Sequence, residues 1–345
     1  MSLLTRWPKQ QLCLDPSRRQ YAVQAVEQAF APTLESLRMD IGLVEMFEAI
    51  YVPLAAWLAR RKEQQTGPLV VGINGAQGAG KSTLFNLLEV ILGDGFDLKV
   101  VGLSLDSLYK THQDRQQLSQ QVHPLLMTRG VPGTHDVELG IELLQSLVNS
   151  DESTITRIPV FDKSTDDRCS EDVWEEWIGP ADIIVFEGWC VGAQPQSEKE
   201  LLDPVNSLEM EEDPDAAWRR YVNEQLKGPY QQLFEMLDVL LMLKVPSMDV
   251  VFEWRSAQEK KLAERIRYIY DTQQPTDLRI MGEDEIVRFI QHYERLTRQM
   301  LDDLPERATI TLHLNNNHKI CDITVNDPIT DPVGPLAELK SAVMS

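Results

Sequence analysis

Short apolar runs alternate along the chain with longer segments in which apolar residues recur every three or four positions. The short runs, bounded by glycine, proline or charged residues, are typical of buried strands. They lie at 70–74, 98–105, 155–161, 183–186, 239–245, 308–314 and 320–325. The longer segments predict amphipathic helices at 84–91, 137–147, 216–226, 250–270 and 283–301. This alternation indicates an α/β fold with a doubly wound, mainly parallel sheet.

Several stretches depart from this pattern. Residues 17–61 have helical periodicity, so residues 1–66 are predicted to form a helical extension packed on a main domain at 67–345. Residues 112–131 are polar and are expected to be irregular. Pro159 predicts that the strand at 155–161 lies at a sheet edge, and Gly228-Pro229 is expected to interrupt a helix. The acidic segment 198–215 is interpreted as an exposed insertion or mobile loop rather than a site.

Composition narrows the possible partners. The chain has 345 residues, is 43% hydrophobic and carries a formal charge of −21. A surface this acidic repels nucleic acid and anionic membranes, so neither is expected as a partner. An anionic substrate would need a local basic pocket. There is no apolar run of about 18 residues, no signal-peptide pattern and no paired cysteine spacing, so a cytoplasmic protein acting on a small molecule is expected. Oligomeric state is not predicted.

A glycine-rich turn follows the first apolar strand. Residues 75–82 fit the pattern G-x-x-x-x-G-K-[ST], with a strand before and a helix after, as a phosphate-binding P-loop requires. Such a turn points backbone N–H groups at phosphate oxygens, and the helix N-terminus adds partial positive charge. Lys81 would reach the β- and γ-phosphates, and Ser82 would offer its hydroxyl to Mg²⁺. The predicted nucleotide-binding residues are Gly75, Ala76, Gln77, Gly78, Ala79, Gly80, Lys81, Ser82 and Thr83.

Two later strands end on carboxylates. Asp106 follows the strand at 98–105, and Glu187 follows the apolar run 183–186. Ligands of open α/β sheets lie outside the carboxyl ends of the strands. Asp106 therefore fits a base that orients and deprotonates an acceptor hydroxyl, and Glu187 fits a carboxylate on the Mg²⁺ side. The alternatives are a turn-forming or capping aspartate and a solvent-facing glutamate.

Basic residues in nearby segments suit an anionic acceptor. Arg129, Lys163 and Arg168 lie in two turns that follow Asp106 in the chain, although isolated basic residues are commonly solvated surface charges. Arg255 lies on the predicted helix 250–270, where a cation could close over the transferred phosphate like a lid. The alternative is an ordinary helix whose basic residues pair with nearby glutamates.

Taken together, the motifs resemble a known family. They are the P-loop, L-D-S-L-Y at 105–109, R-G-V-P-G-T-H-D at 129–136, F-D-K-S at 161–164, F-E-G-W-C at 186–190 and F-E-W-R at 252–255. This set resembles the plant-type D-glycerate 3-kinase family, which belongs to the P-loop kinases that include phosphoribulokinase, uridine kinase and pantothenate kinase.

The resemblance implies ATP and Mg²⁺ as cofactors. It implies a catalytic role for Lys81, Asp106, Glu187 and Arg255, with Ser82 and Glu187 on the metal. It also implies that the acceptor site includes Arg129, His135, Asp136, Lys163 and Arg168.

The expected activity is phosphoryl transfer from ATP to a small hydroxy acid, with D-glycerate converted to 3-phosphoglycerate. One alternative is a kinase of the same fold whose acceptor is a nucleoside, a sugar phosphate or a pantothenate-like alcohol. Another, of a different class, is a switch or scaffold that binds ATP without turnover. The absence of an N-K-x-D segment, which GTPases use to recognise the base, argues against this last alternative.

Overall fold

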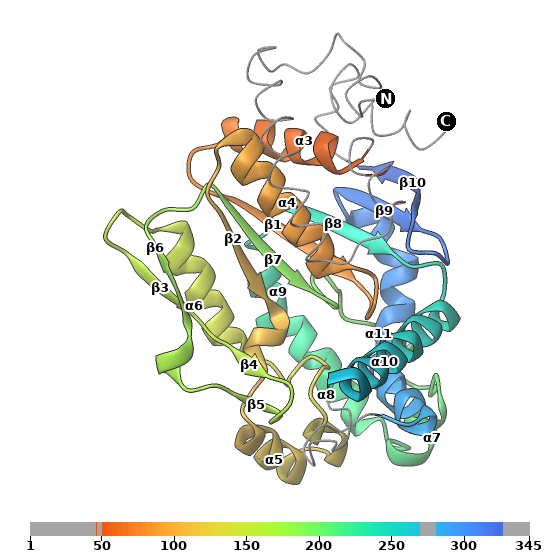
Figure 1. Cartoon of the computed structure of the whole chain (residues 1–345). Helices are drawn as coiled ribbons and strands as arrows, with labels where there is room; N and C mark the ends of the chain where they lie inside the picture. Colours follow the sequence, from red (N-terminus) through yellow and green to blue (C-terminus); the bar gives the residue numbers. More distant parts are fainter. Residues whose placement is uncertain (1–45, 47–49, 270–280, 327–345) are drawn as a thin grey trace.

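The computed structural model describes residues 46, 50–269 and 281–326. Its centre is a six-stranded sheet in the order β10-β9-β8-β1-β7-β2 (Figure 1). The strands are β1 (Leu69–Gly75), β2 (Val100–Ser104), β7 (Ile183–Gly188), β8 (Val239–Lys244), β9 (Ile310–Leu314) and β10 (Ile320–Val325). Every neighbouring pair is parallel except β9 and β10. The predicted mainly parallel α/β sheet is confirmed.

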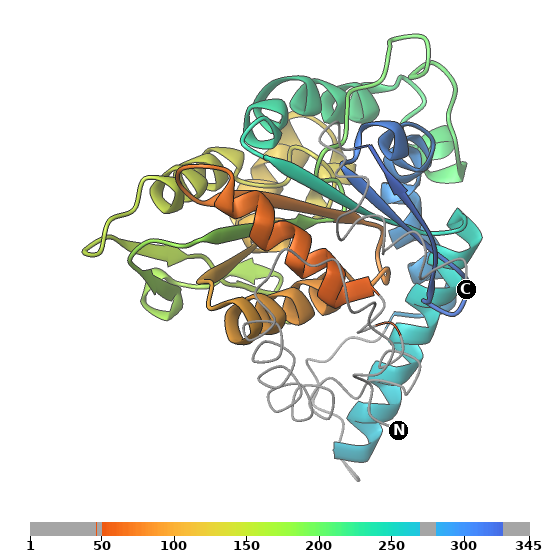
Figure 2. The same ribbon diagram turned by 90° about the horizontal axis from the view of Figure 1, so that it is seen from above.

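Helices cover both faces of the sheet (Figure 2). One face packs against α3 (Val52–Glu63), α4 (Lys81–Phe96) and α10 (Met248–Ile269), and the other against α6 (Val137–Val148), α9 (Gln231–Phe234) and α11 (Glu283–Arg307). Because both faces are covered, β1 and β7 are apolar along most of their length, as the runs in the sequence predicted. None of the described helices is long and apolar enough to cross a membrane.

Only the end of the predicted N-terminal extension belongs to the described residues. Helix α3 covers the last part of the predicted helical region, from Val52 onward, and packs against α4 in the core cluster on its face of the sheet. The remaining positions of the extension, 1–45 and 47–49, lie outside the described residues. A separate helical extension at residues 1–66 therefore stays a proposal.

The polar stretch 112–131 is helical, so the prediction of irregular structure there is wrong. It forms α5 (His112–Gln121) and a 3-10 turn, η4 (Pro124–Met127). Helix α5 has almost no apolar face, and only Arg115 among its residues is buried. Thr111 caps it by accepting a hydrogen bond from the Asp114 N–H. This cap was the available sequence signal, because hydrophobic periodicity cannot reveal a helix that is polar all round.

Strand β3 (Ile155–Ile158) pairs with β6 (Glu175–Ile178) in a separate two-stranded hairpin that encloses a 3-10 turn, η5 (Glu171–Val173). It is therefore an edge strand, as predicted, although it does not belong to the main sheet. The prediction that Gly228-Pro229 interrupts a helix needs correction. Helix α8 (Ala217–Gln225) continues through a π-helical turn, η6 (Leu226–Tyr230), into α9.

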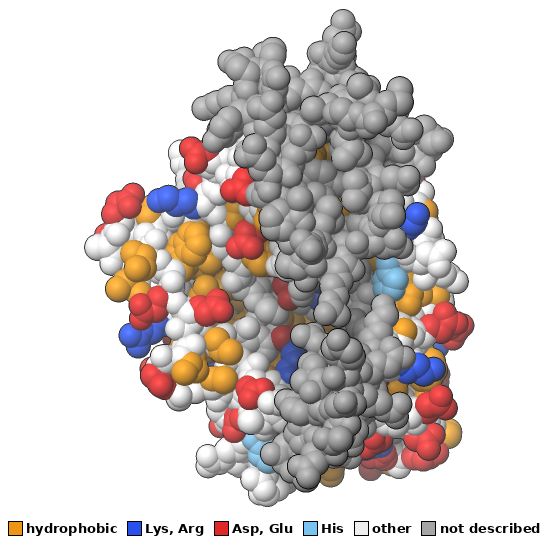
Figure 3. Space-filling view, in the orientation of Figure 1, with side chains coloured by type: hydrophobic (Ala, Val, Ile, Leu, Met, Phe, Trp, Pro, Cys, Tyr) orange, Lys and Arg blue, Asp and Glu red, His pale blue; other side chains and the backbone are white. Residues whose placement is uncertain are grey.

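Two small hairpins project from the region between α6 and β7. The β3–β6 hairpin exposes a directly opposed apolar pair, Ile155 and Ile178, and apolar side chains are visible over this part of the molecule at the left of Figure 3. The second hairpin pairs β4 (Phe161–Asp162) with β5 (Asp167–Arg168). Its four-residue tip, 163–166, reaches the carboxyl edge of the main sheet, where Lys163 meets Asp106.

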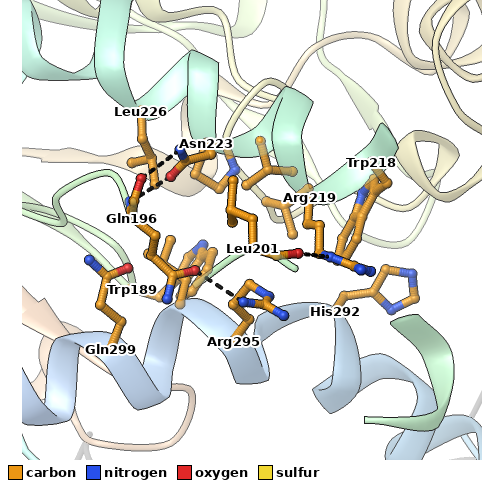
Figure 4. A pocket seen from close by; sticks show the side chains of 14 residues that line it. Trp189, Gln196, Leu201, Trp218, Arg219, Asn223, Leu226, His292, Arg295 and Gln299 are labelled. Atoms are coloured by element: carbon orange, nitrogen blue, oxygen red, sulfur yellow. Dashed lines mark hydrogen bonds between the residues drawn. The ribbon is translucent and has the colours of Figure 1, made fainter. Parts of the chain in front are cut away.

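The acidic segment 198–215 is folded onto α11 and contains a short helix, α7 (Ser207–Glu212), so its interpretation as a mobile loop is wrong. Leu208, Glu209 and Asp213 are buried. Arg295 pairs with Glu209, and Arg219 pairs with Asp213. Figure 4 shows the adjoining junction, where Arg219 donates to the Leu201 carbonyl and Asn223 and Gln196 exchange hydrogen bonds. Four of the eight acidic residues in 198–215 pair with arginines, namely Glu198, Glu209, Glu212 and Asp213, while most of the segment is exposed, as an insertion is expected to be.

Replacing Arg295 with alanine is expected to lower the free energy of unfolding by about 3–5 kcal/mol, because the Glu209 carboxylate would stay buried without its partner. Urea-induced unfolding measures this change. Arg298→Ala on the same helix is the matched control: Arg298 is half exposed and pairs with Glu294, so its loss should cost below about 1 kcal/mol. Equal losses in the two variants would show that the acidic segment is not anchored in this way.

Candidate active site

The P-loop occupies the turn between the end of β1 and the start of α4. Gly78 and Gly80 have positive φ angles of 81° and 92°, a conformation that glycine adopts without strain. Gly80 is the N-cap of α4 and supplies no side-chain cap, so the first N–H groups of the helix remain available to an anion. All the predicted nucleotide-binding positions, 75–83, lie in this one turn and the start of its helix.

A cleft of about 760 Å³ extends from this turn across the carboxyl edge of the sheet. On the P-loop side, Gln77, Gly78, Lys81 and Ser82 line it. The predicted catalytic and acceptor-binding residues that also line it are Asp106, Arg129, Lys163, Glu187 and Arg255. The structure therefore brings together side chains from segments that span nearly 180 positions of the sequence.

Glu187 lies between the P-loop and β2. The strand register pairs Glu187 with Ser104 on β2 and with Ile73 on β1. Ser104 Oγ donates to Glu187 Oε1 at 2.9 Å, and Ser82 Oγ lies 3.4 Å from the same oxygen. Hydroxyl and carboxylate oxygens are the donors that Mg²⁺ prefers, usually one or two from the protein together with phosphate oxygens and water. Ser82 and Glu187 therefore fit a Mg²⁺ ion bound with a nucleotide.

Asp106 sits on a 3-10 turn, η3 (Leu105–Leu108), directly after β2. Lys163 Nζ donates to its Oδ2 at 2.6 Å, and the Tyr109 hydroxyl donates to its Oδ1 at 2.8 Å. Burial raises the pKa of Asp106, but Lys163, Lys81 and Tyr109 more than offset this, so the pKa lies below its usual value. Asp106 is therefore a carboxylate at neutral pH. Tyr109, which orients it, was not predicted as a site residue.

The other predicted acceptor residues lie behind the cleft wall. His135 is buried, stacks on Tyr109 and contacts the Tyr230 hydroxyl through Nδ1 at 2.6 Å. Burial lowers the pKa of His135 to about 3, so it is neutral. The ring packs beneath Tyr109 and is not among the residues that line the cleft, so direct contact of His135 with an acceptor stays only a prediction.

Asp136 and Arg168 pair with each other at 3.1 Å and support the site from behind. Asp136 caps α6 by accepting from the Leu139 N–H, and Arg168 donates to the Tyr109 carbonyl at 2.9 Å. Neither side chain is among those that line the cleft. The geometry gives them a supporting position, and direct contact with an acceptor remains only a prediction for these two residues.

The far wall of the cleft is one face of α11. The sequence analysis predicted this segment only as an amphipathic helix and assigned no site residue to it. Five of its residues line the cleft at helical spacing: Glu285, Arg288, Phe289, His292 and Tyr293. Arg255, the predicted lid residue, sits beside this face: its guanidinium lies 5.3 Å from the centroid of the Phe289 ring and pairs with Glu259 at 3.3 Å. The i, i+3, i+4, i+7, i+8 pattern of these mixed polar and aromatic residues was the available signal.

The backbone around Arg129 is fixed from two sides. The Tyr293 hydroxyl donates to the Arg129 carbonyl at 3.0 Å, and the Trp189 indole N–H donates to the Gly130 carbonyl at 2.8 Å. Gly130 has a φ of 138°, and a Cβ atom there would overlap the Tyr293 hydroxyl. The turn that presents Arg129 to the cleft thus depends on glycine at 130.

We expect Gly130→Ala to destabilise the protein by about 1–3 kcal/mol, through backbone strain and the displaced Tyr293, and to raise KM for the acceptor. Urea unfolding and initial-rate kinetics measure the two effects. Gly228→Ala is the matched control, because a Cβ at Gly228 meets nothing within 4 Å and the residue lies inside a helical turn. A Gly130→Ala protein with the stability and KM of this control would contradict the packing described here.

A family model and a curated relative identify this arrangement. The model for the phosphoribulokinase/uridine kinase family matches residues 70–219. The "Uncharacterized kinase mug58" of Schizosaccharomyces pombe is 31% identical over 255 residues, which cover 71% of this chain and 86% of that one. The chain belongs to the phosphoribulokinase/uridine kinase family. P-loop kinase function follows from this membership, as does the general use of ATP with Mg²⁺ in such kinases.

Two further relatives carry a substrate in their names. The chloroplastic D-glycerate 3-kinase of Arabidopsis thaliana is 26% identical over 66% of this chain, an alignment that spans 50% of that relative. The solved structure of D-glycerate 3-kinase from Cryptococcus neoformans has a TM-score of 0.63 and 25% identity, covering 82% of this chain and 99% of that one. Pantothenate kinases are among the further relatives. The names of these relatives differ in the acceptor, so family membership alone does not identify the acceptor of this chain.

Proposed function

We propose that this protein transfers the γ-phosphoryl group of ATP to a hydroxyl of a small hydroxy acid, with D-glycerate as acceptor and 3-phosphoglycerate as product. The observation that carries the proposal is the position of Asp106. It contacts Lys163 and lies in the same cleft as the P-loop and Arg129, and these two cations match an acceptor carboxylate. A hydroxyl-orienting carboxylate next to carboxylate-binding cations is what phosphorylation of a hydroxy acid requires.

Each residue has a role that its position supports. The P-loop N–H groups and Lys81 bind the phosphates, and Lys81 also stabilises the charge that spreads over the transferring group. Ser82 and Glu187 would hold Mg²⁺, which would neutralise charge on the β- and γ-phosphates when bound. Asp106 orients the acceptor hydroxyl and accepts its proton. Arg129 binds the acceptor carboxylate, and Arg255 closes the cleft beside Phe289.

A second candidate acceptor is a larger alcohol, such as a nucleoside, a sugar phosphate or a pantothenate-like compound. The observation that favours it is the size of the cleft, about 760 Å³, which leaves room beyond three carbons along the face of α11. The charged side chains argue against a nucleoside, because Arg129 and Lys163 would face its uncharged groups, whereas they match any anionic acceptor. A non-catalytic switch would have no use for Asp106 as a base.

The test is a coupled ADP-release assay over a panel of hydroxy acids, nucleosides, sugar phosphates and pantothenate, with Lys81→Ala as the blank. D-glycerate is expected to stimulate ADP release most. Stimulation by uridine or pantothenate alone would overturn the choice of acceptor and leave the kinase class intact. No stimulation by any acceptor would favour the switch or scaffold.

A further inference from the structure

The two basic side chains of the acceptor half each pair with a carboxylate through the tip of the β4–β5 hairpin. Lys163 Nζ lies 2.6 Å from Asp106 Oδ2, and Arg129 pairs with Asp166. Lys163 and Asp166 are the first and last residues of the four-residue tip. The tip therefore places the cation Lys163 on the proposed base, Asp106. It places the anion Asp166 on Arg129, the residue proposed to bind the acceptor carboxylate.

The pair between Arg129 and Asp166 is held in place. Arg115, which is 1% exposed, donates to Asp166 Oδ2 at 3.0 Å, to the Asp166 carbonyl at 2.5 Å and to the Met127 carbonyl at 2.9 Å. The Arg129 guanidinium also lies 5.5 Å from the centroid of the Phe161 ring. Because its partner Asp166 is held by the buried Arg115 and its guanidinium packs on the half-buried Phe161, Arg129 is a stationary part of the cleft.

Lys163 is placed differently. Its side chain is 60% exposed, and its contact with Asp106 is made by a flexible stem that reaches across the cleft. Exposed ion pairs of this kind contribute little to stability, because solvent screens them and ordering the long side chain costs entropy. Lys163 can therefore leave Asp106 without disturbing the fold.

Asp106 is engaged at both oxygens while Lys163 is in this position. The Tyr109 hydroxyl occupies Oδ1, and Lys163 occupies Oδ2. Tyr109 is buried and stacked on His135 with ring centroids 4.7 Å apart, so it stays in place. An acceptor hydroxyl, or a water molecule, would share Asp106 Oδ2 with Lys163, whose charge at 2.6 Å makes that oxygen a weaker proton acceptor.

We propose that Lys163 is an exchangeable cap on Asp106, which the carboxylate of the acceptor draws away as it binds. This inference rests on the proposed function. Once Lys163 has moved, the acceptor O–H bond breaks and its proton passes to Asp106. The hydroxyl oxygen forms a bond to the γ-phosphorus, and the bond from that phosphorus to the bridging oxygen breaks, with its electron pair leaving on ADP. Asp106 then returns the proton to water.

The cap makes the acceptor's own carboxylate a condition for catalysis. An uncharged alcohol such as glycerol offers Lys163 no new partner and leaves it paired with Asp106, where it weakens the base. Water alone does the same, so ATP is protected from hydrolysis while no acceptor is bound. Lys163 thereby acts as a specificity determinant as well as a ligand.

A double-mutant cycle on acceptor binding tests the exchange without turnover. D-glycerate is titrated calorimetrically into nucleotide-free wild-type protein, D106N, K163Q and the double variant. K163Q is expected to bind more weakly than wild type. D106N is expected to bind several-fold more tightly, because Lys163 no longer has to leave a carboxylate, and this gain should vanish in the K163Q background. An Asp106 substitution that weakens binding equally in both backgrounds would overturn the proposal.

A second arm needs no acceptor. ADP release from ATP and Mg²⁺ alone is expected to rise several-fold in K163Q and to return to the wild-type rate in the double variant. K227Q, which removes an exposed lysine paired with Glu224 outside the cleft, should leave this rate unchanged. A K163Q rate equal to or below wild type would overturn the cap. If wild-type protein neither binds nor phosphorylates D-glycerate, the proposed function fails, and this second arm still decides whether Lys163 covers Asp106.

Discussion

Replacing Lys81 with alanine is expected to lower kcat by about 10²–10³-fold, the range for removing one donor that stabilises charge in a transition state. Lys81 is the first residue of α4 and lines the cleft on the P-loop side, where the transferred phosphate would lie. Its ammonium would stabilise the charge that develops on that phosphate as it moves. Steady-state kinetics with saturating ATP and acceptor measure the change.

The control for Lys81→Ala is Lys199→Ala, which removes an exposed lysine of the acidic segment. Both proteins should unfold at the temperature of the wild type, because Lys81 makes a weak internal contact, 3.4 Å from the Ala76 carbonyl. A Lys81→Ala enzyme that keeps more than about a tenth of the wild-type kcat would contradict the placement of the γ-phosphate at this residue.

Asp106→Asn is expected to lower kcat by about 10²–10⁴-fold, the usual contribution of a positioned general base. The amide keeps the size of the side chain and can still accept from Tyr109, but it cannot take the acceptor proton. The loss should appear in kcat and not as a failure to bind the acceptor, since the variant leaves Lys163 and Arg129 in the cleft. Initial rates over a range of acceptor concentrations separate the two effects.

Asp303→Asn is the matched control for Asp106→Asn. Asp303 is also a partly exposed aspartate paired with a basic side chain, Arg307, but it does not line the cleft. It should lose activity only in proportion to its loss of stability. A full kcat in Asp106→Asn would show that another group takes the proton, or that transfer proceeds without a base.

The residues at the carboxyl edge of the sheet could be predicted, because short sequence motifs mark each of them and one rule of topology brings them together. The P-loop spacing marks a strand, a turn and a helix, and Asp106 and Glu187 each follow an apolar run. Carboxyl ends of parallel strands share an edge. The register confirms this, since Ser104 and Glu187 are directly paired across β2 and β7.

The opposite wall could not be predicted in the same way. The sequence predicts α11 only as an amphipathic helix. The helical spacing of its polar and aromatic residues marks one face, but it does not show that Arg288 and Tyr293 on this face turn toward a cleft whose other side lies about 200 residues earlier. The acidic segment was misinterpreted for a related reason. Its many acidic residues are typical of a solvated charge run, but the arginines that pair with Glu209 and Asp213 lie in segments that only the fold brings close. His135 shared a motif with site residues, yet packs beneath Tyr109.

Glycerate phosphorylation is tested most directly by the identity of the phosphorylated product. Purified protein is incubated with ATP, Mg²⁺ and D-glycerate, and the mixture is followed by ³¹P NMR, with the Lys81→Ala protein as the blank. We expect the signal of 3-phosphoglycerate, growing in step with ADP and absent from the blank. Inorganic phosphate as the sole product, or a phosphoester that forms only when D-glycerate is replaced by a nucleoside or pantothenate, would contradict it.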